Sequence, residues 1–400
     1  MHVYDLPLAF AVVGLALYAV LGGADFGAGF WQLVAGRGEQ ARKIHEHSHQ
    51  AMAPVWEANH VWLIFVLTVV WTAYPAAFGS IASTFSIPLF LAGIGIVLRR
   101  GAYALRAGTA TPRERRRVDM VFALSSVLTP FALGTVVGGI ASARVRVGNP
   151  GGSLASSWLN PTSLAIGALA VASAAYLAAV FLSDAAVRDR HPELAERFRR
   201  RALGAGVAAG VVALAGVVVL RIDAHPLFTY LTQGSGVHAL IVSFLAGVAT
   251  LALVWRRRYA PACYSAALAV ATTVAGWALA QQPRFLADLT IKQAAAGYST
   301  QIAVVVAVLG GAVLLFPSLA LLFRLTLARR LTGQERLAAA AHQSLRTTTA
   351  RSARLAAASL IAGIGLLTVA DAGWAHGVGA VSLLAFVACG YCALLHDDPA

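Results

Sequence analysis

The stretch PVWEANHVWLIFVLTVVWTAY, residues 54–74, places a carboxylate, an amide and an imidazole at the start of a long apolar run. A run of about 20 apolar residues is long enough to cross a lipid bilayer as a helix. Ionisable groups at membrane depth are costly, and they usually belong to a pathway or to an ion pair. The stretch therefore predicts a membrane-spanning helix in which Glu57 and His60 have a specific purpose.

The composition of the whole chain agrees with a membrane setting. Of its 400 residues, 58% are hydrophobic and only 12% are charged, and the mean hydropathy is +0.72. Soluble domains carry about 25% charged residues. We therefore predict an all-α polytopic membrane protein. The chain is basic, but its Lys and Arg lie in short loops between apolar runs, so we exclude nucleic acid as a partner.

Eleven apolar runs are long enough to span a membrane. They fall near residues 8–34, 55–75, 80–105, 118–141, 161–184, 202–221, 235–255, 262–281, 299–326, 354–371 and 376–395. The first run has no Lys or Arg before it and no small-residue cleavage site. We expect it to be retained as a span rather than removed as a signal peptide.

The basic residues alternate between the two sets of loops. Of the 31 Lys and Arg, 26 follow odd-numbered spans and five follow even-numbered spans. Cytoplasmic loops carry an excess of Lys and Arg. The pattern predicts a multi-pass plasma-membrane protein with its N-terminus outside and its basic loops and C-terminus in the cytoplasm. The longest polar loops, 36–54, 185–201 and 327–353, are too short for a soluble domain. The basic segment 324–354 is typical of a helix that lies on anionic lipid.

Three stretches carry the charged groups that such spans rarely contain. The first span holds GGADFGAG, residues 22–29, whose small residues allow close helix contact but do not explain Asp25. The second span brings Glu57 and His60, which share a helix face at a spacing of three. The third ends in LRRGAYALR, residues 98–106, with Arg99 and Arg100.

The predicted topology places these groups at similar depth, toward the cytoplasmic side. Two acids, an imidazole and two guanidinium groups can neutralise one another there, with Trp56 and Asn59 beside them on the second span. One interpretation is a structural ion cluster that holds three helices together. The other is the mouth of a proton path that uses Glu57 and Asp25, with His60 as a relay. Residue chemistry alone leaves both open.

Metal and haem sites are weakly supported. The Glu57-x-x-His60 spacing matches di-iron bundles, but those sites need a second such pair and two further glutamates within spans. We interpret HEHSH, residues 45–49, as a solvated loop rather than a metal site. His60 and His238 are the best-placed haem ligands, and they make no convincing axial pair. We therefore assign no metal or haem to this chain. Near span ends, Trp71, Tyr74, Trp158 and Tyr230 are expected to be interfacial anchors.

The motifs together resemble subunit II of cytochrome bd-type quinol oxidases. GADFGAG, residues 23–29, is similar to that family's G-x-D-[FM]-G-x-G element, and WEANHVWL, residues 56–63, to its W-[DE]-x-N-x-x-W-L element. Residues 99–106 resemble the arginine-bearing end of its third helix, and DLTI, residues 288–291, a late outer-loop element. The resemblance covers about residues 5–330. It implies a subunit-II-like domain over 1–330 and a C-terminal extension over 331–400 with two further helices.

The resemblance also implies a fold and a function. The family's oxidase is a bacterial membrane heterodimer that oxidises quinol and reduces dioxygen to water. Its subunit I carries haems b and d and the quinol site. Subunit II has nine helices, as two four-helix bundles plus one, and normally binds no catalytic haem. Carboxylates in its first two helices are linked to proton delivery, and some members hold a structural quinone.

Two departures and two alternatives accompany this expectation. The family often has an acid where this chain has Ala104, so a proton path here is altered or enters elsewhere. The extension 331–400 has no assigned role. One alternative is a secondary transporter that couples ions through the same acids. The other is a purely structural scaffold for a haem-bearing partner.

Overall fold

The computed structural model describes residues 2–36, 38–106, 111–148 and 153–331, with a few residues between 355 and 386. Within the helices, the side chains of residues 53, 54, 56–58, 112, 314–316, 319, 320 and 322–331 lie outside this description. The chain divides into residues 1–309, called the body below, and residues 310–400. The predicted spans at 354–371 and 376–395 lie almost wholly outside the described residues, and the boundary at 330 stays a prediction.

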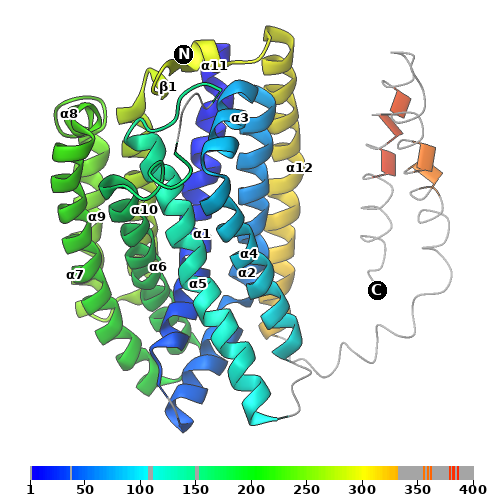
Figure 1. Ribbon diagram of the computed structural model, residues 1–400. Coiled ribbons are helices and arrows are strands. Elements are labelled where there is room, and N and C mark those ends of the chain that lie inside the picture. The colour runs from blue at the N-terminus through cyan, green and yellow to red at the C-terminus, as the bar shows by residue number, and fades with distance from the viewer. Residues whose placement is uncertain are drawn as a thin grey trace. The chain divides into compact units, whose positions relative to one another are not determined.

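Helices make up nearly all of the body (Figure 1). In chain order the structure contains η1 (Val3–Asp5), α1 (Leu6–Leu33), α2 (Glu39–Ala73), α3 (Pro75–Thr84), α4 (Ser86–Arg106), α5 (Pro112–Ala141), α6 (Pro161–Arg188), α7 (Pro192–Asp223), α8 (His225–Gln233), α9 (Val237–Trp255), α10 (Tyr259–Gln281), β1 (Arg284–Leu286), β2 (Leu289–Thr290), α11 (Ile291–Ala294) and α12 (Tyr298–Leu331). The predicted all-α polytopic fold is confirmed. The small antiparallel hairpin β1–β2, in a stretch predicted as an outer loop, was not expected.

Two four-helix bundles form the body. Helices α1, α2, α4 and α5 make the first, and α6, α7, α9 and α10 make the second. Contacts of α1 with α6 and α10, and of α5 with α6, join them. The join needs small residues: a side chain at Gly27 would overlap the backbone of Ala174, and one at Gly138 would overlap the backbone of Ser163. Gly27 belongs to the motif of the first span.

The two bundles repeat one order of elements, namely two long helices, a short helix and two long helices. The break before each short helix has the same cause. Pro75 and Pro226 lack the N–H that would continue the preceding helix, and the ring of each would clash with the carbonyl group four residues earlier. Tyr74 (φ −139°, ψ 60°) and Ala224 (φ −137°, ψ 51°) accordingly leave the helical region. The predicted span at 80–105 is therefore two helices, α3 and α4.

Seven of the described helices are long and apolar enough to cross a membrane. An eighth span is obtained if Asn59–Ala73 and Pro75–Thr84, which meet at 119°, count as one broken span. Within α12 the described apolar part is Tyr298–Val313. Eight of the first nine predicted spans thus each overlap one long helix, and the span at 80–105 overlaps both α3 and α4.

Two loop predictions were wrong. Of residues 185–201, all but 189–191 belong to α6 or α7. Residues 36–54 were expected to be a polar loop, but from Glu39 they form the first four turns of α2. The reason lies in packing that local polarity does not reveal. Ile44 and Met52 are buried in the core cluster that also contains Leu182 and Phe198, and His47 bonds to the carbonyl oxygen of Leu182 at 3.0 Å.

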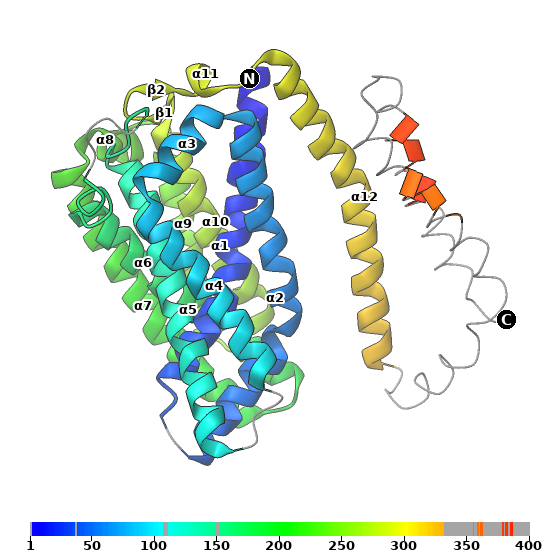
Figure 2. The same ribbon diagram turned by 45° about the vertical axis from the view of Figure 1, so that its right-hand side comes forward.

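The end of the body that carries the N-terminus holds α3, α8, the hairpin and α11 (Figures 1 and 2). Tyr74 is fully buried here, so the prediction that it is an interfacial anchor was wrong. Its hydroxyl donates to the carbonyl oxygen of Tyr4 at 2.5 Å and accepts from the N–H of Leu8 at 3.0 Å. By contrast, Trp71 and Tyr230 are 65% and 50% exposed, as anchors would be.

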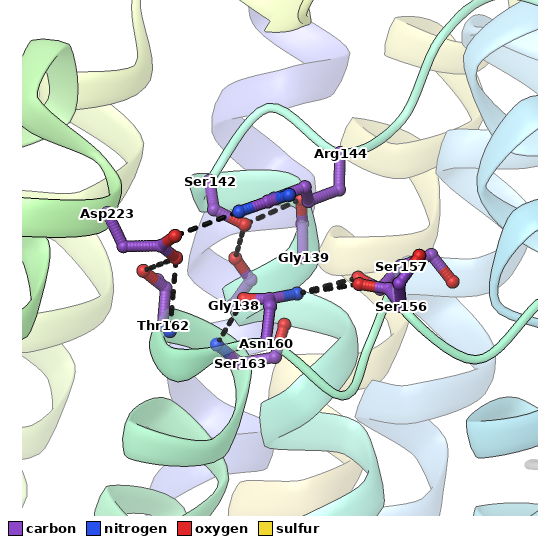
Figure 3. Close-up of polar contacts among 10 residues, drawn as sticks. All are labelled: Gly138, Gly139, Ser142, Arg144, Ser156, Ser157, Asn160, Thr162, Ser163 and Asp223. Atoms are coloured by element: carbon purple, nitrogen blue, oxygen red, sulfur yellow. Dashed lines mark hydrogen bonds and ion pairs between the residues drawn. The ribbon is translucent and has the colours of Figure 1, made fainter. Parts of the chain in front are cut away.

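At the same end, a polar network ties α7 to the start of α6 (Figure 3). Asp223 pairs with Arg144 at 2.8 Å and accepts from the hydroxyl of Thr162 at 2.7 Å and from its N–H at 3.3 Å. Asn160 caps α6 by accepting from the N–H of Ser163 at 2.9 Å. This network fixes the α5–α6 connection to the second bundle.

We expect Asp223→Ala to destabilise the protein, because Thr162 and Arg144 both lose a charged partner. Hydrogen bonds to charged groups are worth about 1.5–3 kcal/mol each, and the partial exposure here favours the lower end. Thermal unfolding of the purified membrane protein, followed by tryptophan fluorescence, measures the effect. Arg221→Ala, at an exposed position two residues earlier, is the control. Equal midpoints for the two variants would contradict the assignment.

Candidate functional site

A buried polar cluster lies inside the first bundle, with one residue from each of its four helices. Asp25 comes from α1, Asn59 from α2, Arg99 from α4 and Ser126 from α5. All four are at most 2% exposed. The buried residues of the second bundle include Leu177, Leu182, Phe198 and Val254, together with the hydroxyl-bearing Ser183 and Thr250. No Asp, Glu, Lys or Arg of the second bundle is buried among the described residues. The polar cluster therefore sets the first bundle apart from its structural repeat.

Arg99 is the centre of the cluster. Its Nη2 lies 2.5 Å from Oδ1 of Asp25 and donates to the Asp25 carbonyl oxygen at 2.8 Å. Its Nη1 donates to the hydroxyl of Ser126. The guanidinium also lies over the rings of Phe122 and Phe26, at 4.0 and 5.1 Å from their centroids. Two aromatic faces and three hydrogen-bond acceptors thus hold the cation in one position.

The carboxylate of Asp25 is held from the other side by Asn59, whose Nδ2 donates to Oδ2 at 3.0 Å. Both oxygens therefore have partners, as burial of a charge requires. Gly29 lies one turn further along α1 and is the last residue of the GADFGAG motif. A side chain there would overlap the hydroxyl of Ser126 and crowd Arg99. The motif's last glycine thus makes room for the ion pair.

A small cavity adjoins the cluster. It offers about 10 Å³ to the centre of a water molecule, which is roughly room for one water. Its wall contains Asp25, Ala28, Gln32, Ser48, His49, Met52, Arg99, Tyr103 and Phe122. Three buried polar atoms of this region have no hydrogen-bond partner among the described residues, namely Ser48 Oγ, Arg99 Nε and Asn59 Oδ1. A buried polar atom without a partner costs about 1–3 kcal/mol, so this cavity favours water.

The structure brings together three of the residues singled out from the sequence: Asp25, Asn59 and Arg99. His60 is half-buried on α2, next to Asn59, and Arg100 is exposed. Trp56 and Glu57 belong to the helical backbone of α2, and their side chains lie outside the described residues. Ala104 is exposed and does not line the cavity.

Sequence reasoning missed Ser126 and the aromatic ring of Phe122. Both belong to α5, where Ser125, Ser126 and Thr129 interrupt an apolar span. Hydroxyl groups in mid-span were a usable signal, although Ser and Thr can also bond to their own helix, as Ser126 does to the carbonyl oxygen of Phe122 at 2.5 Å. Among the residues whose side chains are described, no group of three or more His, Cys, Asp or Glu could hold a metal ion.

Residues 5–326 match the family model "Cytochrome bd terminal oxidase subunit II". A "Putative cytochrome bd menaquinol oxidase subunit II" of Bacillus subtilis (strain 168) is 22% identical over 239 residues, which are 58% of this chain and 67% of that protein. "Cytochrome bd-I ubiquinol oxidase subunit 2" of Escherichia coli (strain K12) is 28% identical over 131 residues, 32% of this chain and 34% of that one. The alignment thus spans about a third of the Escherichia coli relative.

A solved structure supports the same relationship over a longer range. A chain in the structure of bd oxidase from Geobacillus thermodenitrificans superposes with a TM-score of 0.67 at 26% identity. The match covers 82% of this chain and 99% of that chain. The likeness therefore includes the body with both bundles, and it agrees with the range of the family model.

We expect Arg99→Gln to lower the free energy of unfolding by about 3–5 kcal/mol, because it leaves the buried carboxylate of Asp25 unpaired. The double variant Asp25→Asn/Arg99→Gln removes both charges and is expected to recover much of that loss. Thermal or denaturant unfolding of the purified protein measures both.

The matched control is Arg100→Gln, which changes an adjacent but exposed arginine. It is expected to leave the unfolding midpoint nearly unchanged. If Arg100→Gln destabilises the protein as much as Arg99→Gln, the ion pair with Asp25 is not the reason for the loss.

Proposed function

Since the chain belongs to the cytochrome bd terminal oxidase subunit II family, we propose that it serves as the non-haem subunit of a bd-type oxidase in a bacterial plasma membrane. The complex would oxidise quinol, reduce dioxygen to water and act as the last enzyme of an aerobic respiratory chain. The observation that carries this proposal is the combined match of residues 5–326 to the family model and of 82% of the chain to a bd oxidase structure.

The partner we propose is a haem-bearing subunit I, with haems b and d on that subunit and quinol and dioxygen as substrates of the complex. The names of the relatives support this, since each is a subunit of a cytochrome bd oxidase. We assign no cofactor to this chain itself, and a structural quinone stays an open expectation. The alternation of basic loops supports an N-terminus outside and basic loops inside.

Within the complex, we propose that this chain delivers protons from the cytoplasm, through Asp25 and Glu57 with His60 as a relay. The support is the polar interior of the first bundle. Asp25 lies eight residues, or about 12 Å, before the end of α1, so the carboxylate is close to the end with the basic loops. The adjoining cavity has room for water, which a proton path requires.

A purely structural role for the cluster is the second candidate, and a specific observation favours it. Both carboxylate oxygens of Asp25 have protein partners, which is what a fixed ion pair would show. In that case the charges hold α1, α2, α4 and α5 in place, and protons reach the haems through subunit I. The transporter alternative has no comparable support, because the family model, the two relatives and the solved structure named above are all of bd oxidases.

Glu57→Gln in the complex assembled with its natural partner subunit tests the proton role. We expect oxygen consumption to fall by at least about tenfold, equivalent to about 1.4 kcal/mol in the barrier, because an amide cannot release and regain the proton. The reduced-minus-oxidised haem spectrum is expected to survive. Loss of the haems together with activity would assign Glu57 to structure, and unchanged turnover would remove it from the path.

A further inference from the structure

A second ion cluster lies two helical turns from the first. Arg106 follows Arg99 by seven residues on α4, and Asp119 precedes Ser126 by seven residues on α5. Seven residues rise about 10 Å along a helix and return to nearly the same face. Arg106 Nε lies 3.0 Å from Oδ1 of Asp119. The two antiparallel helices therefore repeat an arginine-containing polar contact closer to the α4–α5 connection.

His45 of α2 completes the second cluster, with its Nδ1 3.6 Å from Oδ2 of Asp119. The arginines at 113 and 115–117 lie closer to Asp119 in sequence, but they are exposed, and the described ion pairs of Asp119 are to Arg106 and His45. The side chain of Asp119 is 18% exposed, against 3% for Asp25. The second cluster thus touches solvent, and the first does not.

Two small cavities lie between the clusters. Besides the one next to Asp25, a second of about 10 Å³ borders Asp119 and Arg106. Its remaining wall is formed by Gln32, His49, Ala102, Tyr103, Val118 and Phe122. Gln32, His49, Tyr103 and Phe122 line both cavities, so the two spaces adjoin. Each has room for about one water molecule.

His49 is the imidazole among the four residues that line both cavities. Its ring stacks on that of Tyr103, with centroids 4.3 Å apart. Burial lowers the pKa of His49, Arg106 lowers it further, and Asp119 acts in the opposite direction. The groups that face it are Asp25 from α1, Arg99, Tyr103 and Arg106 from α4, and Asp119 from α5. A neutral imidazole carries one donor and one acceptor nitrogen, so it can take a proton on one side and release one on the other.

We propose that water in these two cavities, with His49 between them, forms the route by which protons reach Asp25 from the solvent at Asp119. One proton enters from bulk water at the Asp119–His45 cluster. His49 accepts a proton on one ring nitrogen and releases the proton of its other nitrogen to the water beside Asp25. The ring is then neutral again but in its other tautomer, and a ring flip or proton exchange with the adjoining water resets it before the next transfer. The proposal rests on the proposed function. It adds an entry point for protons that lies outside the W-E-x-N motif of residues 56–59.

The test uses the assembled oxidase with its haem-bearing partner. His49→Phe keeps an aromatic ring against Tyr103 but removes the exchangeable protons. We expect oxygen consumption to fall about tenfold with the haem spectrum intact, while anaerobic reduction of the haems by quinol keeps its rate. Imidazole added to His49→Ala is expected to restore part of the lost turnover, a rescue that a structural role would not give. If the Phe variant fails to assemble, His49→Gln provides the same comparison.

His47→Gln is the matched control, since His47 is a buried histidine of the same helix that lines neither cavity. It is expected to keep wild-type turnover. Wild-type turnover in His49→Phe, with slow turnover in Asp25→Asn, would overturn this route and leave the proton role of Asp25 standing. Wild-type turnover in both would instead remove the proton role of the cluster altogether. Slow turnover of His49→Phe without imidazole rescue of His49→Ala would also overturn the relay.

Discussion

The ion pair between Asp25 and Arg99 is the interaction on which the first bundle depends. A charge placed among apolar helices must be paired and hydrogen-bonded, or it is strongly destabilising. This requirement explains why one side chain from each of four helices meets at the same depth, and why a glycine stands at position 29. The second bundle repeats the order of helices, but among the described residues it buries no Asp, Glu, Lys or Arg. The two bundles therefore share the order of their helices, and the buried ion pair is what distinguishes the first bundle, in which we propose that proton transfer occurs.

The sequence was sufficient for much of this fold. The positions of the spans followed from the lengths of the apolar runs. The similar depth of Asp25 and Arg99 along the bundle followed from the Lys and Arg of the loops. Both patterns can be read from short stretches of sequence and summed along the chain. Contacts between distant segments were not predictable in the same way. The HEHSH segment was assigned to a loop since its polarity is visible locally, whereas the burial of His47 against Leu182 is not. Asp119 follows a run of arginines in the sequence, whereas its described ion-pair partners lie on α2 and α4.

The two clusters and the cavities between them suggest how a proton route can cross a tightly packed protein. A continuous water channel between the four helices would remove many of the side-chain contacts that hold them together. Two spaces of about 10 Å³ each, separated by an imidazole, leave the packing almost intact. The proposed route also needs no acidic residue at position 104, where this chain has alanine, because Asp119 of α5 supplies a carboxylate at the solvent end. The unpartnered hydroxyl of Ser48 and Nε of Arg99 then find their partners in water.

The central claim is that protons consumed at haems on the partner subunit pass through the Asp25 cluster. The most direct measurement is proton uptake from the side of the basic loops during a single reaction of the reduced, assembled oxidase with dioxygen, followed with a pH-sensitive dye. The double variant Asp25→Asn/Arg99→Gln keeps the cluster neutral and packed. The account predicts that its proton uptake is slowed at least about tenfold while dioxygen still binds at the wild-type rate. Proton uptake at the wild-type rate in this variant would contradict it.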